Sequence, residues 1–419
     1  MIVKSFLLKQ DILPSVAALC GRDTVAVIRP EKQIENILRE AVRKTIREKK
    51  SSREEMDRVR AYFQALSGSE AYQQKASQIV GSIEAYLREG MYVISSEDAI
   101  QDYVLARCAR LCAEAVNSRV QGLLIDGTEL MLCHADARGV QHFDWVASRE
   151  QIKARVPAEG PVIVPGGYGR LDSGYVVRVG KDGAHLMASL IGATLKARSI
   201  EFYIEAPGIE GIPAMTYDEA AHFCASAHAP FASSAIWPAK NGEVPIVVKD
   251  IADSAFAGTV ISTRSTHNRD VISDKDLTLV TVYGTGLLGR VGMSSSIFSC
   301  LSGAGVNVRF IAQTSSEYSI SFAVRSADKE RTQEALQGLF RDNPLLPLDD
   351  VVVLNKEVGI VTIFGSRMRN LPGTSGRVFG TLGEAGINII ASAQGGEELS
   401  ISVVLEAADV DRAVQLLKA

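Results

Sequence analysis

Two stretches near the C-terminal end of the chain decide the fold: residues 280–321 read VTVYGTGLLGRVGMSSSIFSCLSGAGVNVRFIAQTSSEYSIS, and residues 361–402 read VTIFGSRMRNLPGTSGRVFGTLGEAGINIIASAQGGEELSIS. The second lies over the first at a constant offset, without a gap. Each copy predicts an apolar strand, a Gly-containing loop, an amphipathic helix, a Gly-Val-Asn-Val or Gly-Ile-Asn-Ile turn, and two strands joined by a polar turn. Because such self-similarity marks a repeated structural unit, the sequence predicts two small α/β modules.

Length and composition indicate a globular chain with small-molecule or protein partners. The 419 residues, 46% of them hydrophobic, suffice for two or three domains with cores of their own. A formal net charge of -4 produces no field that would gather nucleic acid or anionic lipid, so we expect neither as a partner. Residues 1–11 lack a signal-peptide pattern and no apolar run reaches membrane-spanning length, which predicts a cytoplasmic protein.

The six cysteines predict reduced, mostly buried thiols, because no C-x-x-C pair or metal-type spacing occurs in so long a chain. Cys108 and Cys112 lie one helical turn apart, but two ligands without histidine neighbours make a weak metal site. We therefore predict no metal centre from them.

The first 260 or so residues alternate apolar strands with helices. Strands are expected at residues 24–28, 162–164, 200–204 and 245–248, with helices such as Ala184–Ala197 between them. This alternation predicts one α/β domain with a mostly parallel sheet covered on both faces. Ser52 and Glu55 have the spacing of a capping box that would begin another helix.

The chain resembles aspartate kinase at residues 313–321, at the paired Gly-Asn turns and at the segment Ala257–Ser262. The resemblance implies an amino-acid-kinase-like (carbamate-kinase-like) parallel-sheet sandwich followed by two ferredoxin-like ACT domains. We place the kinase-like domain at 1–262 and the ACT domains at 263–345 and 346–419. The family's reaction converts ATP and L-aspartate to 4-phospho-L-aspartate, with ATP and Mg²⁺ as the implied cofactors, in lysine, threonine and methionine biosynthesis.

The motifs that this reaction requires are altered in the chain. The family's K-F-G-G-T-S falls on residues 4–9, where Lys4 is kept but the glycines and the Thr-Ser pair are not, and S-A-M-G falls unmatched on 28–31. L-G-R-G-G-S-D falls on 179–185, where Asp182 adds a negative charge and Ala184-His185 replaces Ser-Asp. Leucine side chains at positions 7 and 8 stand where a backbone would pass close to phosphate.

Two further motifs are also changed. T-D-V-D-G-V falls on 204–209 with a proline in place of its second acid, the D-P-R segment after it is absent, and G-A-x-V-L-H-P has become residues 227–233. Phosphoryl transfer depends on positioning and on neutralising charge. Five altered motifs therefore predict that the fold is kept while catalysis is lost.

The surviving matches define the candidate kinase site. The resemblance implies Lys4 and Lys181 as catalytic, Glu97 and Arg170 as substrate-binding, and Gly180, Gly183 and Glu205 as nucleotide-binding. Each charged residue among them could instead be a surface charge on a retained fold. Arg170, beside a Gly-rich segment, is the best candidate for holding a carboxylate, because a planar guanidinium does so bidentately.

The resemblance also implies an amino-acid effector, lysine or threonine first, bound where the first ACT module meets a neighbouring module. Its implied contacts are Leu288, Gly289, Asn307, Gln313, Ser315 and Ser316. Asn307 and Asn388 could instead cap turns in the left-handed conformation, which Asn tolerates. The second module, with Gly395-Gly396 in place of the Ser-Ser pair, is predicted to act as the pairing partner.

Two hypotheses of different classes follow. In the first, the chain is an amino-acid-binding regulatory pseudokinase that forms a homodimer through its ACT domains, with an active kinase subunit as a further candidate partner. In the second, it is a working aspartate kinase, or a kinase of another amino-acid carboxylate. ATP binding discriminates between the two.

Overall fold

The computed structural model describes residues 1–90, 96–135, 141–180, 182–204, 212–224, 229–250, 258–264, 270–284, 291–315, 318–341, 352–365 and 368–418. The chain divides into two compact units, Met1–Cys224 with Ala229–Thr266, and Ala225–His228 with His267–Ala419. No helix of the described part is long and apolar enough to cross a membrane.

The first unit is built on an eight-stranded sheet with the order β10-β12-β11-β9-β1-β2-β6-β3. Every neighbouring pair is parallel except β11 with β12. The strands are β1 (Ile2–Leu8), β2 (Thr24–Pro30), β3 (Leu123–Leu124), β6 (Val162–Pro165), β9 (Ile200–Ile204), β10 (Ala214–Thr216), β11 (Ile246–Asp250) and β12 (Thr259–Ser262). Most residues of the central strands are buried because helices cover both faces, so the predicted, mostly parallel sheet is confirmed.

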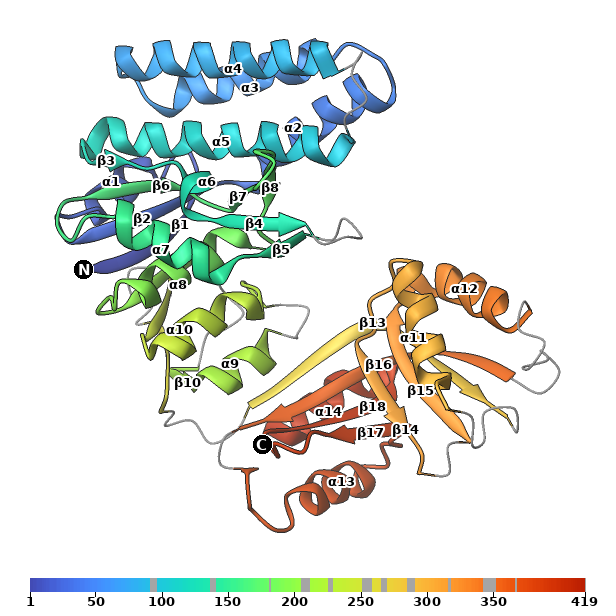
Figure 1. Ribbon diagram of the computed structural model, residues 1–419. Helices are drawn as coiled ribbons and strands as arrows, with labels where there is room; N and C mark the ends of the chain where they lie inside the picture. Colours follow the sequence, from blue (N-terminus) through green and yellow to red (C-terminus); the bar gives the residue numbers. More distant parts are fainter. Residues whose placement is uncertain are drawn as a thin grey trace. The chain divides into compact units, whose positions relative to one another are not determined.

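Helices cover this sheet in layers (Figure 1). One face carries α1 (Leu13–Leu19), α2 (Lys32–Val42), which continues as the π-helical turn η1 (Arg43–Arg47), and α5 (Glu97–Val120); outside them lie α3 (Arg53–Leu66) and α4 (Glu70–Gly90). The opposite face carries α8 (Gly183–Thr194) and α10 (Ile236–Gly242). The remaining helices of this unit are α6 (Gly127–Leu130), α7 (Trp145–Arg155), α9 (Tyr217–Phe223) and η3 (Ser233–Ala235). A second, small sheet has the order β5-β4-β7-β8 and consists of β4 (Leu132–Ala135), β5 (Gln141–Phe143), β7 (Tyr168–Leu171) and β8 (Val176–Arg178).

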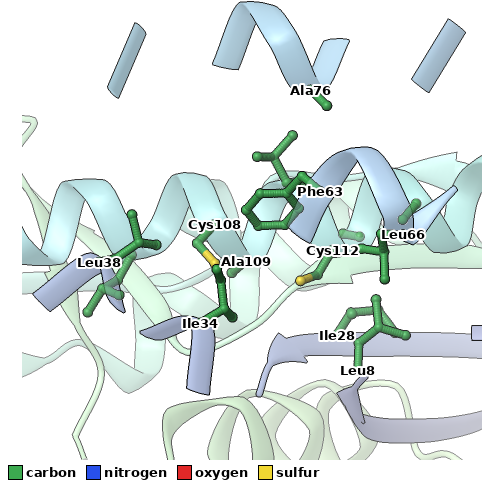
Figure 2. Close-up of a cluster of buried hydrophobic side chains, with 14 of the residues drawn as sticks. Leu8, Ile28, Ile34, Leu38, Phe63, Leu66, Ala76, Cys108, Ala109 and Cys112 are labelled. Carbon is green, nitrogen blue, oxygen red and sulfur yellow. The ribbon is translucent and has the colours of Figure 1, made fainter. Parts of the chain in front are cut away.

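Figure 2 shows the core between the sheet and its helices. Leu8 and Ile28 of the sheet face Phe63 of α3, and the thiols of Cys108 and Cys112 on α5 lie among these apolar side chains. Burial, and then the neighbouring Cys112, raise the pKa of Cys108, so this thiol stays protonated. Four of the six cysteines are buried, which confirms that the thiols are mostly buried.

The predicted capping box at Ser52 is wrong. Ser52 does precede α3, but its hydroxyl accepts a hydrogen bond from Thr45 at 2.7 Å and does not cap the helix. Glu55 is only 4% exposed and pairs with Lys44, because the π-helical turn η1 brings both Lys44 and Thr45 to this loop.

A capping box forms instead at α9. The backbone N–H of Thr216 donates to the Glu219 carboxylate at 2.6 Å, and the N–H of Glu219 donates to the Thr216 hydroxyl at 3.1 Å. Glu219 therefore stabilises a helix end.

The second unit contains a six-stranded sheet of order β14-β15-β13-β16-β18-β17. Its strands are β13 (Asp270–Tyr283), β14 (Phe310–Gln313), β15 (Ser319–Arg325), β16 (Val352–Phe364), β17 (Ala391–Gln394) and β18 (Ser400–Glu406). Its helices are α11 (Met293–Gly303), η5 (Ser326–Asp328), α12 (Lys329–Arg341), α13 (Thr374–Glu384), η8 (Ala407–Asp409) and α14 (Val410–Lys418). Each module contains two helices: α11 and α13 are the helices that the repeated pattern predicts, and α12 and α14 follow the repeat and were not predicted from it.

The two modules share their longest strands. Both the earlier part of β13, Asp270–Asp274, and its later part, Leu277–Tyr283, pair with β16, whereas only the later part also pairs with β15. A register shift separates the two parts of β13. Val280 consequently belongs to the core around α11 and α12, while Val271 belongs to the core around α13 and α14. Neither module completes its sheet without the other.

Candidate functional site

Strand β1 occupies the segment that the resemblance assigns to the phosphate-binding loop. It runs as a regular strand through Leu8, with Leu7 and Leu8 in register with Arg29 and Pro30 of β2. Phe6 and Leu8 are fully buried in the core above the sheet. Since a paired strand uses its backbone groups for the ladder, this segment forms no Gly-rich cradle.

Lys4 lies within β1 and is held by a buried carboxylate. Its Nζ donates to the carbonyl of Leu19 at 2.9 Å and lies 3.6 Å from Oε2 of Glu201 on β9. Glu201 also accepts hydrogen bonds from Lys249 Nζ at 2.8 Å and from the Tyr203 hydroxyl at 3.0 Å. Burial alone would raise the pKa of Glu201, but the bond from Lys249 and the charge of Lys4 outweigh it and hold that pKa below its usual value. Lys4 thus belongs to an ion-paired network inside the sheet.

The N-terminus of α8 meets an ion pair formed by the chain itself. Asp182 stands at the N-cap with a left-handed φ of 56°, and its carboxylate lies 3.3 Å from Nη1 of Arg29 at the end of β2. A helix N-terminus favours negative charge. Here Asp182 supplies that charge and Arg29 balances it.

The glycines at this turn are required by the backbone. Gly180 has a φ of 67°, which glycine adopts without strain. A Cβ on Gly183 would lie 3.0 Å from the carbonyl oxygen of Gly167, and one on Gly166 would lie 2.5 Å from a methyl group of Val27. The Gly-rich segment therefore allows close packing of β6 and β7 against α8. The positive φ of Gly180 and the close packing at Gly183 thus account for both glycines without any ligand.

Further charges of both signs surround the carboxyl end of β2. Burial raises the pKa of Glu35, although Arg39, Arg29 and Arg178 act in the opposite direction. Burial also raises the pKa of Asp102, whose carboxylate accepts the backbone N–H of Arg178 at 2.8 Å. Cations and carboxylates of this region thus neutralise one another.

His185 lies in the first turn of α8 and is fully buried. Its ring is 4.5 Å from that of Phe202, and neither ring nitrogen has a hydrogen-bond partner among the described atoms. Burial, and then the charge of Arg29, lower the pKa of His185 well below the ordinary value. The hydroxyls of Ser5 and Ser189 are likewise buried without partners. This neutral cluster holds no charge for a phosphoryl group or a metal ion.

The other described residues of the predicted kinase site lie on separate elements. Glu97 begins α5 and is half-buried, whereas Arg170 lies exposed on β7, in register with Leu132 of β4. Arg170 forms no ion pair within the described part of the chain. Lys181 and Glu205 lie outside the described residues, so their roles stay predictions.

A small cavity of about 80 Å³ lies between α5 and the β7–β8 hairpin, and sequence reasoning missed it. The Arg107 guanidinium lies 5.0 Å from the centroid of the Tyr103 ring and donates to its hydroxyl at 3.1 Å, while Arg110 pairs with Asp126 at 2.8 Å. The available signal was two arginines three residues apart, which share one face of a helix. The cavity is lined by Tyr103, Ala106, Arg107, Arg110, Asp126, Thr128, Pro165, Tyr168 and Val176.

In the first ACT module, Asn307, Gln313 and Ser315 are exposed. Their side chains make no hydrogen bond within the residues that the structure describes. The alternative that Asn307 and Asn388 adopt the left-handed conformation is wrong, because Gly305 and Gly386, with φ of 68° and 71°, occupy those turn positions. Leu288, Gly289 and Ser316 lie outside the described residues.

The second module satisfies the corresponding groups internally. Gln394, the repeat equivalent of Gln313, accepts a hydrogen bond from the Ser375 hydroxyl at 3.0 Å. The backbone N–H of Asn370, in the segment after β16, donates to the Glu398 carboxylate at 2.8 Å. A carboxylate of the chain thus accepts from a backbone amide that could otherwise donate to a ligand.

Comparison with known proteins agrees with this architecture. A family model described as "ACT domain" matches residues 280–340 and 361–419. The bifunctional aspartokinase/homoserine dehydrogenase of Haemophilus influenzae is 28% identical over 292 residues, and aspartokinase 2 of Bacillus subtilis is 27% identical over 274 residues. The structure of E. coli aspartokinase III in complex with lysine and aspartate (T-state) covers 100% of this chain and 98% of its own, with a TM-score of 0.80 and 19% identity. The chain belongs to the aspartokinase family.

The matches extend over different shares of this chain and of its aspartokinase relatives. The matches cover 65% of this chain and 35% of the Haemophilus protein, and 61% of this chain and 65% of the Bacillus protein. A second structure of E. coli aspartokinase III, in complex with aspartate and ADP (R-state), has a TM-score of 0.78 at 19% identity. At this identity the structures establish the fold of this aspartokinase-family chain.

Proposed function

We propose that this aspartokinase-family chain is a cytoplasmic regulatory protein that binds an amino acid and lacks kinase activity. The observation that carries the proposal is β1, which continues as a paired strand through Leu8 where the family has its phosphate-binding loop. Leucine side chains there remove the close backbone approach that a triphosphate requires.

The described residues do not fit a nucleotide at α8 either. A triphosphate at this helix N-terminus would meet the Asp182 carboxylate, which Arg29 already neutralises. Lys4 is engaged with Glu201 and the Leu19 carbonyl. ATP and Mg²⁺ therefore have no part in the proposal.

The second candidate is a working aspartate kinase, or a kinase of another amino-acid carboxylate, with a rearranged site. The observation that favours it is that the fold matches E. coli aspartokinase III over the whole length of this chain. One structure of that enzyme is a complex with aspartate and ADP. Lys181 and Glu205 would then contribute from the segments outside the described residues. The activity assay proposed in the Discussion separates the two candidates.

The amino-acid ligand is assigned to the first ACT module. E. coli aspartokinase III was solved with lysine, and lysine or threonine is the first choice for this chain. The exposed amides of Asn307 and Gln313 and the hydroxyl of Ser315 supply both donors and acceptors, which suits a zwitterion. Leu288, Gly289 and Ser316 complete the proposed set of contacts.

The first expected result is a thermal shift on adding lysine or threonine to the full chain. Ligand at about 100 times its dissociation constant adds about 2.7 kcal/mol to the free energy of unfolding. Asn307→Ala and Gln313→Ala are expected to abolish the shift, because each removes both a donor and an acceptor from the proposed contacts.

The repeat supplies matched controls for this experiment. Asn388→Ala and Gln394→Ala change the equivalent positions of the second module, so they are expected to keep the shift. A panel of all amino acids that shifts nothing would contradict the sensing role. If the variants of both modules lost the thermal shift equally, the assignment of the ligand to the first module would be contradicted.

A homodimer through the ACT unit is proposed as the assembly. Strand β14 is an edge of the six-stranded sheet, and its Ile311 is 48% exposed. Edge strands of small modules pair readily unless a charge intervenes. An active kinase subunit is the alternative occupant of this edge.

Light scattering is expected to show a dimer for the natural chain and a monomer for Ile311→Lys. The added lysine places a charge on the strand edge, which disfavours pairing. Leu371→Lys, at a loop residue that is 50% exposed, is the control and should remain a dimer. A monomeric natural chain at micromolar concentration would point to a partner subunit instead.

A further inference from the structure

An open pocket of about 560 Å³ lies in the outer helical layer of the first unit. One wall is the loop between η1 and α3, and the others are the exposed sides of α3 and α4. It shares no residue with the region around β1 and α8 or with the ACT modules. Its lining is Thr45, Lys49, Lys50, Ser51, Ser52, Arg53, Met56, Asp57, Arg60, Glu84, Leu87 and Arg88.

The lining carries an excess of positive charge. Five of its side chains are cationic and two are carboxylates. Arg60 engages both carboxylates, Asp57 at 2.7 Å and also Glu84, and Lys50 pairs with Glu48 outside the lining at 3.1 Å. Arg60 balances one of these two negative charges, and the lining as a whole keeps an excess of cationic side chains.

Two arginines remain without a close counter-charge. Arg53 lies 4.0 Å from the nearest carboxylate, that of Asp57, which Arg60 already holds. Arg88 on α4 forms no ion pair in the described part of the chain. Because an arginine guanidinium presents a rigid fork of donors that matches carboxylate and phosphate oxygens, these two side chains form the core of an anion site.

Backbone groups add to the same wall. The Ser52 hydroxyl is bonded to Thr45 and does not cap α3. The Ser51 hydroxyl accepts the N–H of Arg53 at 3.3 Å and keeps the loop folded over the helix start. The first turn of α3 also carries the carboxylates of Glu54 and Glu55, so the attraction for an anion comes from the arginines more than from the helix start.

We propose that this pocket binds a small, multiply charged anion, a phosphate ester or a di- or tricarboxylate, held chiefly by Arg53 and Arg88. The volume lies within the range of about 300–1,000 Å³ that small-molecule sites occupy. The site is concave and flanked by charges of alternating sign, which suits a compact anion and disfavours an extended polyanion. The inference is independent of the function proposed above.

The test titrates the full chain with pyrophosphate and with citrate by calorimetry, at constant ionic strength. One saturable site is expected for at least one probe, and the better probe distinguishes the phosphate from the carboxylate class. Arg53→Gln with Arg88→Gln should weaken binding by about tenfold or more, since each removes a charge-assisted contact. Arg88→Gln alone should give part of that loss.

The control is Arg47→Gln with Arg58→Gln, which removes the same charge from exposed neighbours that do not line the pocket. This variant should bind within about twofold of the natural chain, because charges outside the site act only through screened long-range attraction. Absence of saturable binding for both probes, or an equal loss in the control, would overturn the proposal. Unchanged melting temperatures of the variants would confirm that any loss is local.

Discussion

The purified chain, given L-aspartate and MgATP, is expected to form no acyl phosphate above the uncatalysed background in a hydroxamate assay. Loss of one contact to the transition state costs about 2.7–4 kcal/mol, or about 10²–10³ in rate. The strand in place of the phosphate loop and the Arg29–Asp182 pair at α8 remove at least two such contacts. The combined loss is about 10⁴–10⁶ from a typical turnover of about 1–10³ s⁻¹.

The control is an active aspartokinase assayed under the same conditions, with a parallel titration of MgATP by calorimetry. The chain is expected to give no binding heat, because the described residues leave no uncompensated cation at the helix start for the triphosphate. Turnover near the typical range, abolished by Lys4→Ala, would instead support the working-kinase candidate. If Lys181→Ala abolished that turnover, Lys181 would be the cation that neutralises the transferred phosphate.

Replacing Glu201 with Gln is expected to lower the free energy of unfolding by about 3 kcal/mol. Glu201 is buried between Lys4 and Lys249, and removing one member of a buried ion pair typically costs about 3–5 kcal/mol because a charge is left unpaired. We expect the lower end of this range because the Lys249 side chain is 33% exposed, so water can hydrate its charge once the carboxylate is removed. Gln keeps the size of the side chain and can still accept from Tyr203. Urea denaturation of both proteins measures the difference.

The pH dependence of this difference checks its cause. Since the pKa of Glu201 is held below its usual value, its stabilising contribution is complete above the unfolded-state pKa of about 4.3 and is lost as the pH falls through the lower folded-state pKa. The two proteins should therefore converge in acid. Glu129→Gln, which breaks the exposed pair with Arg155, is the control and should cost no more than about 1 kcal/mol. If Glu201→Gln cost no more than this control, Lys4 would be free of a structural role and its catalytic role would reopen.

Much of the architecture could be predicted because its signals are local in the sequence. The repeat at residues 280–321 and 361–402 predicted two α/β modules, and alternating apolar strands and helices predicted the parallel sheet; both are confirmed. The absence of a C-x-x-C pair or metal-type spacing likewise predicted mostly buried thiols, and four of the six are buried. Such patterns are readable because burial of one face imposes a period on neighbouring residues.

The amino-acid sequence by itself thus determined the kind of elements, their order and the family resemblance, because periodicity and turn residues act over a few positions. Only the tertiary structure decided which groups meet: Lys4 with Glu201, Arg29 with Asp182, and Ser52 with Thr45 in place of a capping box. It also decided that β13 and β16 each serve both modules. Some of these pairings join residues up to about 200 positions apart, and the pairing of Ser52 with Thr45 depends on a π-helical turn. No local sequence pattern encodes such pairings, because the partners of a side chain depend on where whole elements pack.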